Sequence, residues 1–88
     1  MRAKDYRAAF DIYQQALVED PEDPVLNLNA GFAAQNLGLE TQAAQYYRRA
    51  VALGEDVPVG TTIANSAGER EVETTVADLA RRNLATLQ

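Results

Sequence analysis

The chain has 88 residues, enough for one small domain with a thin core, and its apolar content of 47% argues against intrinsic disorder. A net charge of −5 disfavours nucleic acid and anionic membranes as partners, and the lack of histidine and cysteine excludes disulfides, thiolate chemistry and the usual zinc ligands. With no apolar run of membrane-spanning length and no signal sequence, we expect a soluble chain whose compartment is left open.

Residues 3–18 carry an apolar stripe with spacings of three and four, which predicts one amphipathic helix. The stripe consists of Tyr6, Ala9, Phe10, Tyr13, Ala16 and Leu17. Pro21 disfavours helical backbone at Asp20, so this helix should end by Glu19. The following segment, EDPEDP, is predicted to be a turn because it combines four acids with two prolines.

Residues 24–53 are predicted to form an antiparallel helical hairpin. Asp23 is a good N-cap, and Pro24 suits the first helical position, where its missing N–H costs nothing. Gly38 can take the left-handed conformation that closes this helix near Leu37. The partner helix should begin near Glu40 or Thr41 and end near Leu53.

The second half of this hairpin repeats the first helix. Ala9, Tyr13 and Ala16 recur as Ala43, Tyr47 and Ala50, each pair 34 positions apart (43 − 9, 47 − 13, 50 − 16). With Pro24 as position one, the characteristic tetratricopeptide positions fall on Asn29, Ala30, Gly31, Gly38, Ala43, Tyr47 and Ala50. The chain therefore resembles a tetratricopeptide repeat protein, with one full repeat at about 24–57 and the second half of a preceding repeat at about 3–23.

This resemblance implies an all-α fold in which antiparallel helical hairpins stack as a short α-solenoid. The repeat pattern fails after Gly54, where EDVPVGTTIAN contains a proline, a glycine and five β-branched residues. Residues 54–65 are therefore predicted to be an irregular, non-helical insertion. At least one of Val57, Val59 and Ile63 is expected to pack on a helix, because these side chains are too apolar for a free linker.

Residues 66–87 are predicted to form a terminal helix that begins at a capping box of Ser66 and Glu69. Its apolar stripe consists of Val72, Val76, Leu79, Ala80, Leu84 and Leu87. Two interpretations of this helix stay open. Asn83, Leu84 and Ala85 resemble Asn29, Ala30 and Gly31 at a spacing of 54 (83 − 29), which would start a further repeat; otherwise the helix is a terminal cap.

Catalytic and cofactor chemistry is not indicated by any motif. The acids between Glu19 and Asp23 lack the spacing of a calcium loop, and VPVGTT lacks the lysine of a phosphate loop. The tyrosines fall at helical spacings that favour core packing over base stacking. No metal or other cofactor is expected, and an enzyme is disfavoured because the usual nucleophile–base pairs need histidine or cysteine.

The resemblance implies a protein-interaction module that binds a peptide or a partner protein on its concave face. The family's groove positions fall on Val25, Leu28, Phe32, Gln35 and Asn36. The alternative is that a neighbouring helix buries Leu28 and Phe32. The family's clamp for a C-terminal carboxylate is not supported, because residues 24–37 contain no lysine or arginine. The alternative function is a small helical ligand-binding or enzyme-accessory domain.

The first helix matches the second half of a repeat, so its stripe lacks the helix that would cover it within an intact unit. Two outcomes are open: the last helix and residues 55–65 fold back over the stripe, or a second chain covers it. The order of the helices favours the second outcome. Possible self-association is therefore assigned to Tyr6, Phe10, Tyr13 and Leu17.

Overall fold

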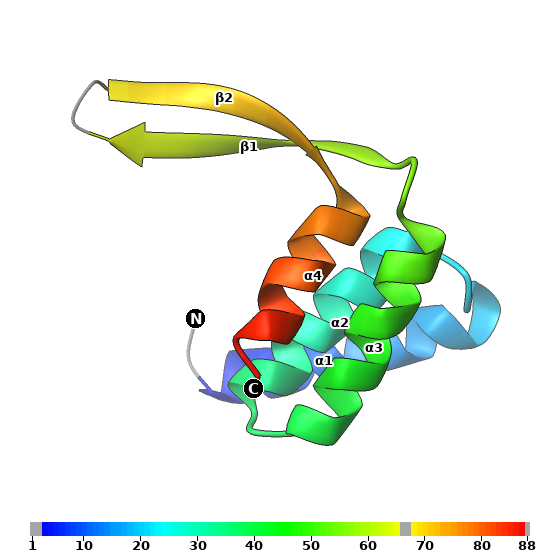
Figure 1. Cartoon of the computed structure of the whole chain (residues 1–88). Helices are drawn as coiled ribbons and strands as arrows, with labels where there is room; N and C mark the ends of the chain where they lie inside the picture. The colour runs from blue at the N-terminus through cyan, green and yellow to red at the C-terminus, as the bar shows by residue number, and fades with distance from the viewer. Residues whose placement is uncertain (1–2, 66–67, 88) are drawn as a thin grey trace.

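The computed structural model describes residues 3–65 and 68–87 (Figure 1). These residues form, in order, α1 (Ala3–Glu19), α2 (Pro24–Asn36), α3 (Glu40–Leu53), β1 (Pro58–Asn65), β2 (Gly68–Thr75) and α4 (Val76–Ala85). The described chain is mostly helical, as predicted. The β-hairpin is a departure from the predicted all-α class.

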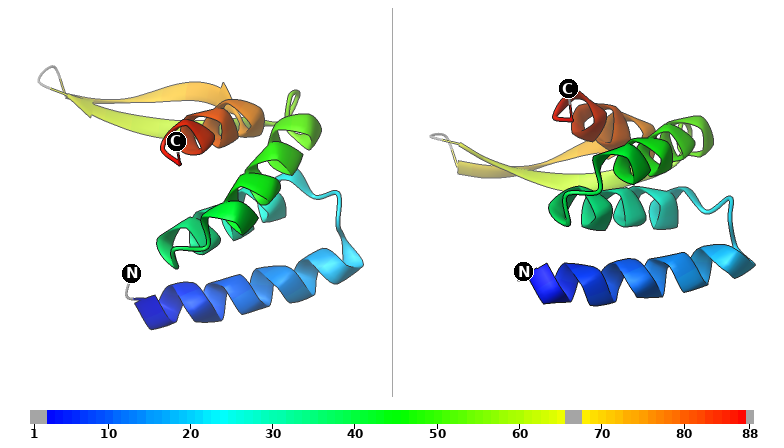
Figure 2. Two further views of the ribbon diagram at one scale, coloured as in Figure 1. Left: turned by 60° about the horizontal axis from the view of Figure 1, so that its bottom comes forward. Right: turned by 90° about the horizontal axis from the view of Figure 1, so that it is seen from below.

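The helices stack in chain order, with α1 on α2, α2 on α3 and α3 on α4 (Figure 2). Phe10 and Leu17 of α1 are buried against this stack. The turn between α1 and α2 is held by Asn27, whose side-chain amide donates to the backbone oxygens of Pro21 at 3.2 Å and Asp23 at 2.8 Å. These bonds fix the direction in which the chain re-enters the helical layer.

The predicted helical hairpin of residues 24–53 is confirmed, and it contains no strand. The Asp23 carboxylate accepts from the Leu26 N–H at 3.0 Å, which caps α2. Gly38 has a φ of 78°, the left-handed conformation that the turn needs and that glycine adopts without a steric penalty. Local capping chemistry thus determines both ends of α2.

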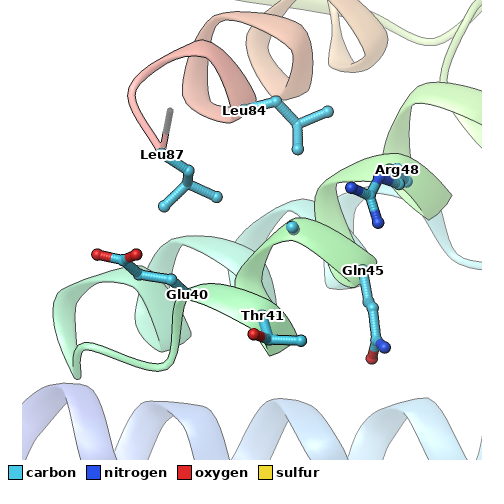
Figure 3. Close-up of a pocket in the computed structure, with 7 residues that line it drawn as sticks. Glu40, Thr41, Gln45, Arg48, Leu84 and Leu87 are labelled. Atoms are coloured by element: carbon cyan, nitrogen blue, oxygen red, sulfur yellow. The ribbon is translucent and has the colours of Figure 1, made fainter.

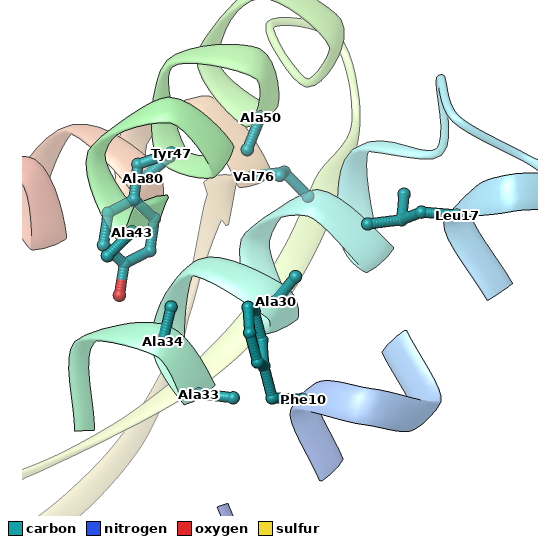
Figure 4. Close-up of a cluster of buried hydrophobic side chains, with 10 residues drawn as sticks. All are labelled: Phe10, Leu17, Ala30, Ala33, Ala34, Ala43, Tyr47, Ala50, Val76 and Ala80. Carbon is teal, nitrogen blue, oxygen red and sulfur yellow. The ribbon is translucent and has the colours of Figure 1, made fainter. Parts of the chain in front are cut away.

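Small side chains bring the two helices of this hairpin close together. A Cβ added at Gly31 would lie 2.7 Å from two ring carbons of Tyr47, far inside van der Waals contact. Tyr47 is fully buried, together with the alanines that surround it (Figure 4). The contact between α2 and α3 therefore holds one large ring, Tyr47, among small residues, because only small residues allow so close an approach.

The segment after Gly54 is regular where an irregular insertion was predicted. Strands β1 and β2 pair antiparallel from Pro58↔Thr75 to Asn65↔Gly68. The expectation that 54–65 is non-helical is confirmed. The physical reason for the strand is the β-branched run in residues 57–63, which favours extended backbone once a partner strand is available.

The prediction of one helix over 66–87 is wrong in its first half. Residues 68–75 form β2, and α4 begins only at Val76. Ser66 lies outside the described residues, and Glu69 is in β2, so the predicted capping box does not start a helix. The helix is capped instead by Thr75, whose hydroxyl accepts from the Asp78 N–H at 3.1 Å.

Helix α4 is anchored to the end of α3 by backbone hydrogen bonds. The Val76 N–H donates to the Val57 oxygen at 2.9 Å, and the Ala77 N–H donates to the Gly54 oxygen at 3.2 Å. Val57 is half-buried and packs on the core, which confirms that one apolar residue of this segment covers a helix surface. The side chains of Val59 and Ile63 lie outside the described part of the chain.

The β-hairpin extends from the helical body as an arm, visible in each view (Figures 1 and 2). Its main contact with the body is between β2 and α4, the element that directly follows it. The hairpin therefore lengthens the connection between α3 and α4, and its backbone extends away from the helical body.

Candidate protein interaction surface

The residues predicted to line the binding face all lie on or at the end of α2, but they play different parts. Val25 is 41% exposed, Phe32 is 47% exposed and Asn36 is exposed. Val25 and Phe32 are seven positions apart (32 − 25), about two helical turns, so they lie along one side of the helix. Val25 and Phe32 thus form an exposed apolar strip on α2.

Gln35 belongs to the packing of the fold. The Tyr47 hydroxyl donates to Gln35 Oε1 at 2.7 Å, and Gln35 Nε2 donates to the Thr86 hydroxyl at 2.6 Å. This amide joins α2, α3 and the end of α4 in one chain of hydrogen bonds. Gln35 is thus already hydrogen-bonded within the chain, and its role in binding a peptide or a partner protein stays a prediction.

Burial of the two central apolar residues differs. Leu28 is half-buried and packs against the core, in line with the alternative that a neighbouring helix covers it. Phe32 stays exposed on one side, and its ring meets Tyr6 of α1 edge-to-face, with 5.9 Å between the ring centroids. The edge contact orients Phe32 while leaving part of its ring open to solvent.

Burial determines the protonation state of Tyr47 in this series of hydrogen bonds. Burial raises the pKa of Tyr47 to about 12, while a side-chain hydrogen bond with Asn83 acts in the opposite direction. The phenol therefore stays protonated over the physiological range and serves as a hydrogen-bond donor to Gln35. It is a structural group of the helical core.

The four residues predicted to mediate self-association differ in their burial. Phe10 is 2% exposed and Leu17 is buried, both by contacts within one chain. The prediction that a second chain contacts these two residues is therefore wrong. The physical reason is that α2 covers this edge of the stripe, and Tyr46 of α3 adds an edge contact to Phe10 at 5.9 Å between ring centroids. Tyr6 and Tyr13 remain half-exposed.

Two exposed residues on α1 were not predicted as site residues. Ile12 is 63% exposed and Val18 is 83% exposed. Ile12 lies beside Tyr13 in the sequence and widens the uncovered apolar face of α1. Its helical spacing was visible in the sequence, but its orientation depended on which side of α1 meets α2.

An open groove lies between α3 and the end of α4, with a cavity of about 300 Å³ (Figure 3). Its lining consists of Glu40, Thr41, Ala44, Gln45, Arg48, Leu84 and Leu87. Leu84 and Leu87 are half-buried, so this groove combines apolar side chains with a polar edge. We refer to it as the α3–α4 groove.

Within the described residues, no group of three or more His, Cys, Asp or Glu side chains is positioned to hold a metal ion. No helix of that part of the chain has the length and apolar character needed to cross a bilayer.

Comparisons of the chain with protein-family models, curated proteins and solved structures gave no match.

Proposed function

We propose that this chain is a tetratricopeptide-like protein-interaction module that binds a peptide or a partner protein along α2. The observation that carries the proposal is the exposed apolar strip of Val25 and Phe32 on a helix whose other side is packed. Exposed apolar side chains on an ordered helix are favourable contact points because their burial by a partner releases water at little conformational cost.

The rigidity of α2 supports this role. Its packed side holds Ala30, Ala33 and Ala34, all 0–1% exposed, and its start is fixed by the Asp23 cap. A binding strip on such a helix is held in one geometry before the partner arrives. Preorganisation of this kind raises affinity because less freedom is lost on binding.

The chemistry of the strip indicates the class of partner. Asn36 is exposed at its end, and its side-chain amide donates to the Phe32 oxygen at 2.9 Å, which leaves its side-chain oxygen as an acceptor. Helix α2 contains no lysine or arginine. The proposed partner is therefore an apolar segment with modest polarity, an extended peptide or the apolar face of a helix, and its recognition does not depend on a terminal carboxylate.

Selection from a random-peptide display library on the folded chain would test the proposal. We expect enriched peptides to bind the wild type and the Val18→Glu variant but to lose at least tenfold in affinity on Phe32→Glu. Val18 is the matched control because it is exposed, apolar and on a different helix. Peptides that bind all three proteins equally, or a selection without enrichment, would contradict the proposed strip.

The alternative function, a small ligand-binding or enzyme-accessory domain, would be favoured by an enclosed cavity with several convergent charged groups. The cavities of the described residues are surface grooves, and the α3–α4 groove has one acid and one base at its polar edge, Glu40 and Arg48. We therefore propose the interaction module alone.

A further inference from the structure

Residues of α1 and α3 that match at a spacing of 34 differ in their burial: they are buried on α3 and partly exposed on α1. On α3, Ala43, Tyr47 and Ala50 are fully buried. Their matches on α1 at a spacing of 34, Ala9, Tyr13 and Ala16, are each half-exposed. Helix α1 thus presents to solvent the side that its repeat partner buries against another helix.

The spacing of 34, taken together with the spacing of 54 between α2 and α4, relates the α3–α4 groove to a covered site. Ala44 in the groove matches Phe10 (44 − 34), and Leu84 and Leu87 match Ala30 and Ala33 at the spacing of 54 (84 − 30, 87 − 33). Phe10, Ala30 and Ala33 are all 0–2% exposed.

At the covered site the third helix completes the burial, since Tyr46 of α3 places its ring against Phe10 and the adjacent Tyr47 packs on Gly31. At the α3–α4 groove the corresponding place is open, because Leu84 and Leu87 line a cavity and are half-exposed.

The two spacings also indicate which residues would be in contact if the face of α1 covered the α3–α4 groove. Tyr46 matches Ile12 (46 − 34), the exposed residue on α1, and Tyr47 matches Tyr13. Gly31 matches Ala85 (31 + 54), which is exposed beside the groove. The face of α1 therefore carries the side chains that the α3–α4 groove lacks.

We propose that two copies of this chain associate head to tail, with α1 of one copy seated in the α3–α4 groove of the other. Ile12 enters the cavity over Ala44 and Leu84, and Tyr13 lies over Ala85, whose Cβ keeps this ring farther from α4 than Tyr47 lies from α2 at Gly31. This contact does not use Val25 or Phe32, so it stands apart from the proposed binding strip on α2.

Because the two surfaces differ, each copy keeps one free α1 face and one free groove after the first contact. Such a heterologous contact does not end at a dimer unless the copies close into a ring. The proposal thus predicts that mass continues to increase with protein concentration.

Sedimentation velocity of the 88-residue chain across a dilution series would test the proposal, using Ile12→Lys and Ala85→Lys as the two surface variants. Both side chains are exposed, and the two substitutions add the same charge, so the variants gain no new ion pair with each other. Gln42→Lys is the charge-matched control, since Gln42 is exposed on α3 and does not line the groove. Circular dichroism checks that each variant is folded. If a lysine variant is unfolded, the glutamine variant at the same position, Ile12→Gln or Ala85→Gln, takes its place.

We expect wild type and Gln42→Lys to exceed the dimer mass at high concentration, and each surface variant alone to stay monomeric. An equimolar mixture of Ile12→Lys and Ala85→Lys should form a dimer that does not grow, because one intact α1 face meets one intact groove. A monomeric wild type, a surface variant that still associates, or a mixture that stays monomeric would overturn the proposal.

Discussion

The two hairpins of this chain, helical and β, are stabilised in opposite ways. In the helical hairpin of α2 and α3, each turn of the helix buries side chains against a neighbour, and Tyr47 lies fully inside. The β-hairpin pairs its two strands with each other and meets the helical body mainly next to α4. Isolated two-stranded hairpins are marginal in water, so stability should be concentrated in the helices.

The substitution Gly31→Leu should have the largest effect on this comparison. A single added Cβ already lies 2.7 Å from the Tyr47 ring, so a leucine must displace the ring or separate the helices. We expect a loss of roughly 1–3 kcal/mol in the free energy of unfolding, measured with urea. Phe32→Leu, on the exposed side of the same helix, should change it much less. Equal losses would mean that the helical contact is looser than described.

Alkaline pH should weaken the helical core through Tyr47. Its pKa is about 12 in the folded chain against an ordinary value of 10.0, so the unfolded chain releases this proton first. Stability from this group is intact below pH 10 and decreases as pH rises from 10 toward 12, by at most about 1.4 kcal/mol per pH unit. Urea unfolding at several pH values would measure the slope. Tyr47→Phe should show a shallower slope; an unchanged slope would assign the effect to the other tyrosines.

The boundary between the two regions can be tested at Thr75, the last residue of β2 and the N-cap of α4. Replacing it with alanine removes the acceptor for the Asp78 N–H and should cost about 1 kcal/mol. Thr75→Ser keeps the hydroxyl and serves as the control. Thermal unfolding followed by circular dichroism would compare them, and a larger loss from serine than from alanine would be inconsistent with the cap.

Removal of the β-hairpin should have the smallest effect. Pro58 and Thr75 are paired at its base, so a short Gly-Ser turn can replace residues 59–74 without moving α4. We expect a loss below about 0.5 kcal/mol, since few contacts join the hairpin to the body. A control variant keeps the length of residues 59–74 but has their sequence scrambled. It separates the effect of amino-acid composition from the effect of strand pairing. A loss as large as that of Gly31→Leu would show that the hairpin stabilises the helices.

The exposure of the residues predicted to bind a partner followed from the sequence only in part. The strip on α2 was located from the repeat pattern, and Val25 and Phe32 are exposed as a binding role requires. Gln35 was predicted to contact a peptide or a partner protein, and it is hydrogen-bonded to Tyr47 and Thr86 within the chain. Its use depends on a hydroxyl 51 positions away in the chain, which no local pattern indicates.

The sequence by itself determined the helical hairpin of residues 24–53, because caps, apolar periodicity and the glycine turn act within a few residues. Tertiary structure alone decided two other features. Residues 68–75 carry both helical and extended signals, and pairing with β1 selects the strand. The α1 stripe is apolar on a wide face, and packing on α2 selects Phe10 and Leu17 for burial while leaving Ile12 in solvent. Both choices depend on contacts between segments far apart in the sequence, where local propensity carries no information.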